Sequence, residues 1–123
     1  MKGLALAMAT VAVLAGCGGS GSGGGSTQPA GSIKVTMTEF HYEPSTLTAS
    51  HGTVVFWLVN AGTVSHDFVI RDSSNNRVSS SELISVSDQV AFKVDNLAAG
   101  TYSIFCDQQA HESSGMKGTL TVT

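Results

Sequence analysis

Residues 97–106 of the chain read LAAGTYSIFC, a turn followed by a short run of alternating apolar residues. A tyrosine just after a turn is typical of a tyrosine corner, which closes a crossover in a β-sandwich. Side chains alternate between the two faces of a strand, so if Tyr102 and Ile104 point into the core, Cys106 lies on the same face. The segment therefore predicts a sandwich with an inward-facing cysteine at the end of a strand, where the loops begin.

Similar runs continue through residues 32–123 and are separated by turn residues, whereas no segment shows a convincing helical period. The expected strands include 33–38, 53–60, 66–70, 90–94, 101–106 and 119–122, with turns at 43–45, 60–62 and 72–81. We predict an all-β fold, a two-sheet Greek-key β-sandwich of about seven or eight strands. The polar stretch 73–87 is expected to be a surface excursion in which Glu82, Leu83 and Ile84 form one helical turn.

The N-terminal region differs in composition from the rest. A basic start is followed by the apolar run 4–14, which has the length of a secretory signal and is short for a membrane span. The run ends in Leu14-Ala15-Gly16-Cys17, which resembles a bacterial lipobox, whose cysteine is acylated. The alternative is ordinary cleavage with Cys17 as a bystander.

These features divide the chain into three parts. We predict a lipoprotein signal segment at 1–17 that ends at the lipidated Cys17, a flexible Gly/Ser-rich linker at 18–31, and one folded domain at 32–123. The expected location is extracytoplasmic, in the periplasm or at the cell surface, with the lipid on Cys17 holding the protein to a membrane.

Size and charge exclude several classes of protein. About 90 residues can hold one small domain but no TIM barrel or two-domain dehydrogenase. Lys and Arg number 6 against 9 Asp and Glu, for a formal net charge of −3. Because the five basic residues of the domain stand singly in the sequence, we expect no nucleic-acid partner. We expect a monomer and no enzymatic activity.

The cysteine count points to a metal site. If Cys17 carries lipid, Cys106 has no intramolecular disulfide partner, and a lone thiol outside the cytoplasm is oxidised unless it is buried or metal-bound. His111 and Met116 follow it at intervals of five residues, and His66 begins another apolar run just after a turn. A thiolate, two imidazoles and a thioether thus gather at the predicted strand ends.

Two imidazoles and one thiolate with a weak axial thioether form the donor set of a blue copper site. Zinc fits less well, because structural zinc takes four strong ligands and gains little from a thioether. A third reading makes Cys106 a nucleophile activated by His111, although the sequence offers no orienting third group.

Two segments resemble the cupredoxins, the small blue copper proteins. Residues 60–68 read NAGTVSHDF, similar to the family's Asn-x-Gly…His segment, and residues 100–106 are followed by His111 and then by Gly115-Met116-Lys117-Gly118. The resemblance covers residues 33–123, and the four residues on each side of His111 are most similar to the spacing in auracyanin and rusticyanin. It implies a cupredoxin-like sandwich that binds one type 1 copper ion through His66, Cys106 and His111, with Met116 as the axial ligand.

One neighbour of the predicted site departs from the family pattern. Asp67 stands where the family often has Asn, and a carboxylate accepts hydrogen bonds but cannot donate them, so any hydrogen bond to the Cys106 sulfur must come from the main chain. His41 and His51 lie outside the pattern, and we expect neither to bind metal.

The resemblance implies a one-electron carrier between redox protein partners, membrane-associated through Cys17, with His111 as the more exposed imidazole and the port for electrons. An alternative is a copper carrier or storage protein that delivers copper to an oxidase. A metal-free adhesion or scaffold sandwich is a third reading, which leaves Cys106, His111 and Met116 as coincidence. Copper enzymes on this fold use further domains and copper ligands that this chain lacks.

Overall fold

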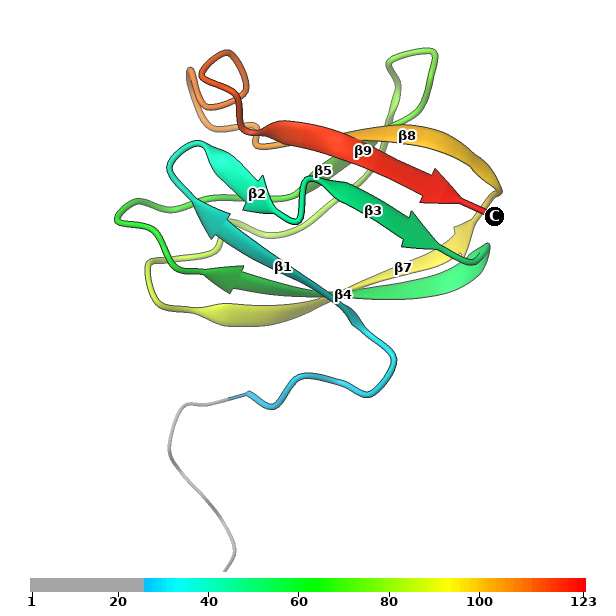
Figure 1. Cartoon of the computed structure of the whole chain (residues 1–123), viewed down its shortest axis with the longest axis horizontal. Coiled ribbons are helices and arrows are strands. Elements are labelled where there is room, and N and C mark those ends of the chain that lie inside the picture. Colours follow the sequence, from blue (N-terminus) through cyan, green and yellow to red (C-terminus); the bar gives the residue numbers. More distant parts are fainter. Residues whose placement is uncertain (1–25) are drawn as a thin grey trace, which may run out of the picture.

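The computed structural model describes residues 26–123, which form nine strands in two facing sheets (Figure 1). The predicted signal segment, with Cys17, and most of the predicted linker lie outside the described residues. Within 26–123 no helix has the length and apolar character needed to cross a membrane.

The chain passes repeatedly from one sheet to the other, as expected for a Greek-key sandwich. The four-stranded sheet has the order β2-β1-β4-β7, formed by β1 (Ile33–Thr38), β2 (His41–Glu43), β4 (Gly52–Asn60) and β7 (Gln89–Leu97). The five-stranded sheet has the order β3-β9-β8-β5-β6, formed by β3 (Thr46–Ala49), β5 (Val69–Arg71), β6 (Arg77–Ser80), β8 (Gly100–Phe105) and β9 (Lys117–Val122). Both sheets are mixed, because β1 runs parallel to β4 and β3 runs parallel to β9.

The core lies between the sheets and follows the alternation of the strands. In β1 the buried residues are Val35 and Met37, and the register places Val35 opposite Leu58 of β4. Phe56 of β4 and Phe68, which immediately precedes β5, are fully buried, with ring centroids 5.0 Å apart. Each such side chain stabilises the fold by about 1.5–3 kcal/mol relative to an exposed one.

The predicted tyrosine corner is present. The Tyr102 hydroxyl donates a hydrogen bond of 2.7 Å to the carbonyl of Ala98, across the turn between β7 and β8. Ile104 and Cys106 are both buried, so the predicted inward face of this strand is confirmed. The cysteine is therefore held where β8 ends and the next loop begins.

Residues 26–123 form nine strands, more than the seven or eight expected. Two strands that were not expected, β2 and β3, lie on either side of the turn at 43–45, although β3 alternates normally, with Leu47 and Ala49 buried. Strand β6 lies within the expected loop, and its polar residues suit an edge strand that is largely open to solvent.

The expected helical turn at 82–84 is also absent, because Ile84 is buried and forms an isolated β-bridge with His66. The two residues exchange main-chain hydrogen bonds of 3.1 and 2.8 Å. His66 itself precedes β5 rather than belonging to it.

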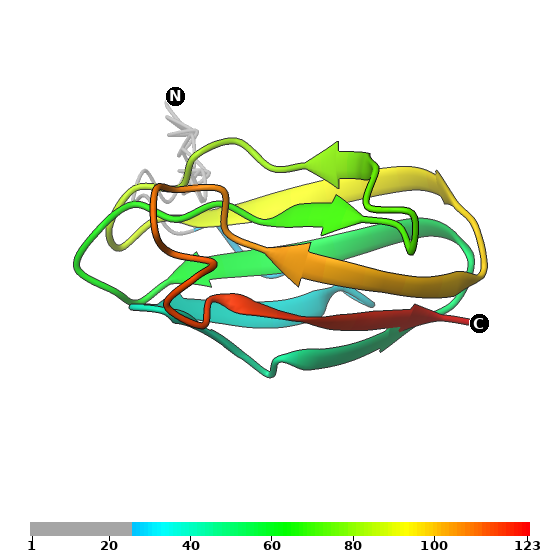
Figure 2. The same cartoon turned by 90° about the horizontal axis from the view of Figure 1, so that it is seen from above.

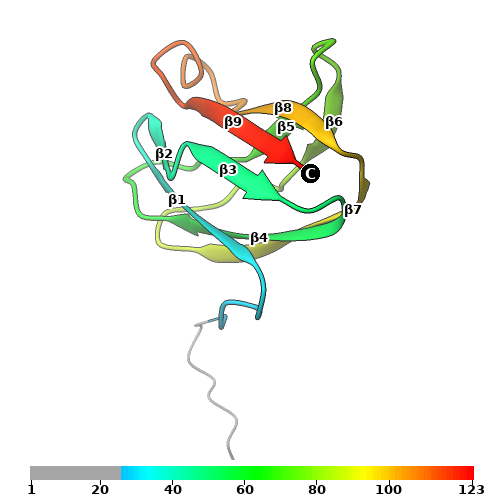
Figure 3. The ribbon, with the colours of Figure 1, turned by 45° about the vertical axis from the view of Figure 1, so that its right-hand side comes forward.

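Loops from distant parts of the sequence meet at one end of the sandwich. Figure 2 shows the loop after β8, in orange, and the loop after β4, in green, at the end opposite the C-terminus. The turn between β1 and β2 lies at the same end in Figure 3. This end holds every residue of the predicted metal site.

Candidate metal centre

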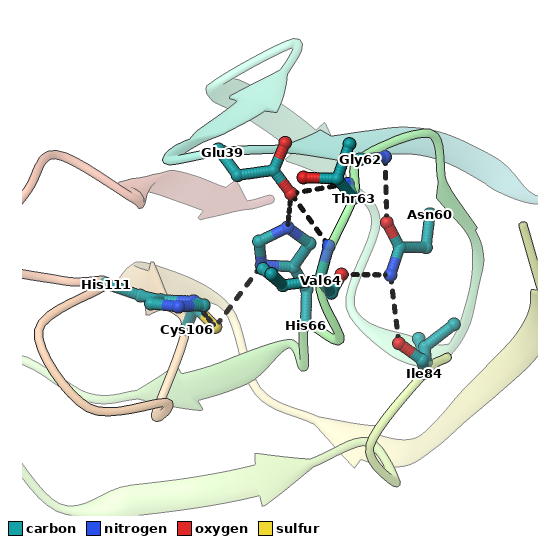
Figure 4. A network of polar contacts seen from close by, with 9 residues as sticks. All are labelled: Glu39, Asn60, Gly62, Thr63, Val64, His66, Ile84, Cys106 and His111. Carbon is teal, nitrogen blue, oxygen red and sulfur yellow. Dashed lines mark hydrogen bonds and ion pairs between the residues drawn. The ribbon is translucent and has the colours of Figure 1, made fainter. Parts of the chain in front are cut away.

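Three of the four predicted ligands lie together. The ligand atoms of His66, Cys106 and His111 are all within 4.8 Å of one another. The Cys106 Sγ is 4.0 Å from Nδ1 of His66 and 3.4 Å from Nδ1 of His111, so both rings present the same nitrogen to the sulfur. Figure 4 shows the two imidazoles converging on the sulfur from different loops.

Met116 is fully buried and closes the loop that carries Cys106 and His111. The amide of Cys106 donates to the Met116 carbonyl at 3.1 Å, and the amide of Met116 donates to the His111 carbonyl at 3.0 Å. The first bond connects the two ends of the loop, and the second connects its C-terminal end to His111 in its middle. Residues at both ends are also held by β8 and β9, which pair directly.

The loop before His66 is held by Asn60. The Asn60 amide donates to the carbonyls of Val64 at 2.8 Å and Ile84 at 3.0 Å, and its oxygen accepts the Gly62 amide at 2.9 Å. Asn60 is itself buried at the end of β4. Since a buried amide group needs partners, these three bonds hold one loop geometry.

Asp67 joins the two ligand loops. Its carboxylate accepts the Asp107 amide at 2.7 Å, and its carbonyl accepts the buried Tyr42 hydroxyl, also at 2.7 Å. Backbone N–H groups of Asp67 and Gln108 act to lower the pKa of the Cys106 thiol. A main-chain donor to the Cys106 sulfur stays a prediction.

Burial favours the neutral forms of the donor groups. Desolvation raises the pKa of the Cys106 thiol to about 11, against the opposing backbone hydrogen bonds. Desolvation likewise lowers the pKa of His66, which has no exposed surface. A thiol with a raised pKa is a poor nucleophile at neutral pH, which argues against the reading of Cys106 as a catalytic residue.

Comparison with known proteins assigns the family. A family profile described as a Cupredoxin-like domain matches residues 5–122. The chain belongs to the cupredoxin family. A plastocyanin from Scenedesmus fuscus is 34% identical over 86 residues, which are 66% of this chain and 85% of that protein.

Solved structures share this cupredoxin's fold. The dithionite-reduced auracyanin from Roseiflexus castenholzii superposes with a TM-score of 0.67 at 21% identity, covering 75% of this chain and 96% of the other. The oxidised plastocyanin from Dryopteris crassirhizoma gives a TM-score of 0.58 at 27% identity, covering 74% of this chain and all of the other (100%). The all-β sandwich predicted from the sequence is thereby confirmed.

The donor set of this cupredoxin fits copper. A thiolate suits Cu(I), imidazoles suit both oxidation states, and a buried thioether is available from the same loop. Within residues 26–123, this is the one cluster of three or more potential metal-binding side chains. His41 lies instead against Glu43, and His51 contacts the Thr123 carbonyl.

Two residues beside the histidines were missed in the sequence. Glu39 and Phe40 form the turn between β1 and β2, where Glu39 Oε1 lies 3.1 Å from Nε2 of His66. The Phe40 ring meets the His111 ring edge-on at a centroid distance of 5.0 Å. Neither residue belongs to a ligand-like spacing, so no local signal in the sequence marks them.

Glu39 is an ionised carboxylate in this setting. The hydrogen bond from the Thr63 backbone, with smaller contributions from Val64 and His66, lowers the pKa of Glu39 to about 2 despite opposing desolvation. A negative charge therefore stands beside a buried imidazole of the site.

Proposed function

We propose that this cupredoxin is a blue copper protein that carries single electrons between redox protein partners. Copper would be held by His66, Cys106 and His111, with the buried thioether of Met116 as a weaker fourth donor. The observation that carries the proposal is the convergence of the Cys106 Sγ and two Nδ1 atoms within 4.8 Å. Copper held by these donors would supply a one-electron Cu(II)/Cu(I) couple.

The protein's contribution is to keep the donors in one arrangement. The His66–Ile84 bridge, the Asn60 hydrogen bonds and the Cys106–Met116 hydrogen bond each anchor a ligand loop to the sandwich. Electron exchange is fast when the ligands need little rearrangement between oxidation states. Anchoring of this kind supports a carrier rather than an enzyme that must admit a substrate.

The two histidines differ in their access to solvent, and His111 is the proposed port. His66 is fully buried, whereas His111 is partly exposed. Two exposed apolar side chains, Phe40 at 40% and Val64 at 41% exposure, belong to the turns beside the site. Exposed apolar side chains beside the proposed port would favour brief docking of a partner protein.

Burial also disfavours copper delivery as the main function. His66, Cys106 and Met116 have almost no exposed surface, so release of an ion would require the ligand loops to open. An electron needs no such opening.

We further propose that residues 1–17 are a lipoprotein signal segment, 18–31 a tether and 32–123 the copper domain, outside the cytoplasm. The tether would reach about 20 Å. Strand β1 begins at Ile33, shortly after the proposed tether, and its six residues span about another 20 Å before the turn next to the proposed metal site. The proposed anchor would therefore leave the His111 end accessible, and Cys17→Ser should release the protein from the membrane fraction.

Copper addition tests the function directly. We expect the metal-free domain to take up one equivalent of Cu(II) and to show an intense thiolate-to-copper band with narrow hyperfine splitting in electron paramagnetic resonance. Cys106→Ser should abolish the band, and His41→Ala, on the surface of β2, should leave it unchanged. A colourless wild-type product would refute the proposal.

A further inference from the structure

The turn between β1 and β2 places one carboxylate oxygen against the loop that carries His66. Glu39 Oε1 accepts the amide of Thr63 at 2.7 Å and the amide of Val64 at 3.1 Å, and it lies 3.1 Å from Nε2 of His66 (Figure 4). One oxygen thus connects the backbone of the loop to the imidazole that the loop carries. The Glu39 side chain is 29% exposed, whereas the His66 side chain is fully buried.

This contact determines which nitrogen of His66 faces the proposed metal. Nδ1 points toward the Cys106 Sγ at 4.0 Å, and Nε2 points toward the carboxylate. Since a carboxylate only accepts, a neutral ring must carry its proton on Nε2 and leave the Nδ1 lone pair free. The hydrogen bond to Glu39 therefore selects the tautomer that can bind a metal through Nδ1.

The Glu39 carboxylate lies very close to the backbone of Gly62. A Cβ atom added to Gly62 would overlap Glu39 Oε1 and would stand 3.0 Å from Nε2 of His66. Glycine at this position therefore permits the close approach of Glu39. The contact between Glu39 and His66 therefore depends on how the turn between β1 and β2 packs against the loop that contains Gly62.

We propose that Glu39 is a positioning residue that directs Nδ1 of His66 toward the metal and stabilises Cu(II) relative to Cu(I). The inference rests on the copper site proposed above. A hydrogen bond to an anionic acceptor makes the imidazole a stronger donor, and the negative charge favours the more highly charged ion. Both effects lower the reduction potential.

The chain contains a matched control for the charge. Glu43 makes the same kind of contact with His41, at the same distance of 3.1 Å, but both side chains are exposed. Glu43→Gln removes one negative charge from a carboxylate–histidine pair outside the metal site. A general effect of net charge would therefore act equally in the Glu39 and Glu43 variants.

The first measurement is the reduction potential of the copper-loaded protein. Glu39→Gln keeps an acceptor oxygen but removes the charge, and we expect Cu(II) binding to weaken about tenfold relative to Cu(I). For a one-electron couple this raises the potential by about 59 mV. Glu43→Gln should match the wild type, and an unchanged potential in Glu39→Gln, or equal shifts in both variants, would refute the inference.

A second variant displaces the carboxylate without removing it. Gly62→Ala should push Glu39 away from His66 and raise the potential in the same direction as Glu39→Gln. Combining the two changes should add little to either alone, because both act through one contact. Fully additive shifts would mean that Gly62 and Glu39 act separately.

The metal-free protein tests positioning independently of copper. Ring-nitrogen NMR should show His66 as a single tautomer with its proton on Nε2 in the wild type and in Glu39→Gln, and as a mixture in Glu39→Ala. A wild type without a fixed tautomer would refute the positioning role. If the wild type binds no copper, the proposed function and the effect on the potential fail together, while this spectrum still decides the positioning role.

Discussion

The two histidines of the site both present Nδ1 to the Cys106 sulfur, but they differ in burial and in the residues that contact them. His66 is fully buried and is held by a β-bridge to Ile84 and by Glu39. His111 sits on the loop between β8 and β9, is partly exposed and lies against the Phe40 ring. The two proposed ligands thus differ in solvent exposure and in the side chains that contact them.

The strongest test of this contrast is to remove each ring and offer a replacement. In His111→Gly, imidazole added to the solution should enter the vacated, partly exposed position and restore the blue colour. In His66→Gly the vacated space is enclosed by the sandwich, so added imidazole should restore little or none. Visible spectra of both variants, titrated with copper and imidazole, decide the matter, and equal recovery would show that burial does not separate the two ligands.

The next test compares the anchors of the two loops. Asn60→Ala removes the donor to the carbonyls of Val64 and Ile84 in the His66 loop and should lower the free energy of unfolding by about 2–3 kcal/mol. The control is Ser113→Ala in the His111 loop, where an exposed hydroxyl donates to Ala110 and the loss should stay below about 0.5 kcal/mol. Chemical denaturation of the metal-free proteins measures both, and comparable losses would contradict a more firmly anchored His66 loop.

The smallest expected effect concerns the support of His111. Phe40→Ala removes the edge-on ring contact and should lower the free energy of unfolding by about 0.5–1.5 kcal/mol. We also expect the His111 ring to become more mobile, seen as broadened ring resonances in the metal-free protein, with those of His66 unaffected. Broadening of both rings would indicate that the turn between β1 and β2 acts on the site as a single unit.

Much of the site could be predicted because strand periodicity is local. Tyr102, Ile104 and Cys106 alternate in sequence, and this alone places the thiol on the inner face at a strand end. The family-like order of His66, Cys106, His111 and Met116 then predicts the donor set. The alternation of β3 is also present in the sequence, but this strand has only four residues and directly follows the turn residues at 43–45, so it gives a weak signal.

Other features had no local signal. Ile84 lies in a polar segment, yet it is buried because its backbone pairs with that of His66. Strand β6 is polar because it is an edge strand, and such strands lack the two-sided burial that makes a clear pattern.

Alternation and residue type are properties of short segments, so the sandwich and the chemistry of the donors can be read from the sequence. Which histidine is buried, and which side chains contact each ring, depends on how distant strands and loops pack together. Glu39 and His66 are 27 positions apart and meet because β1 and β4 pair in parallel and end side by side. The donor residues can thus be recognised in short segments of the sequence, whereas their surroundings depend on the pairing of strands that are distant in the chain.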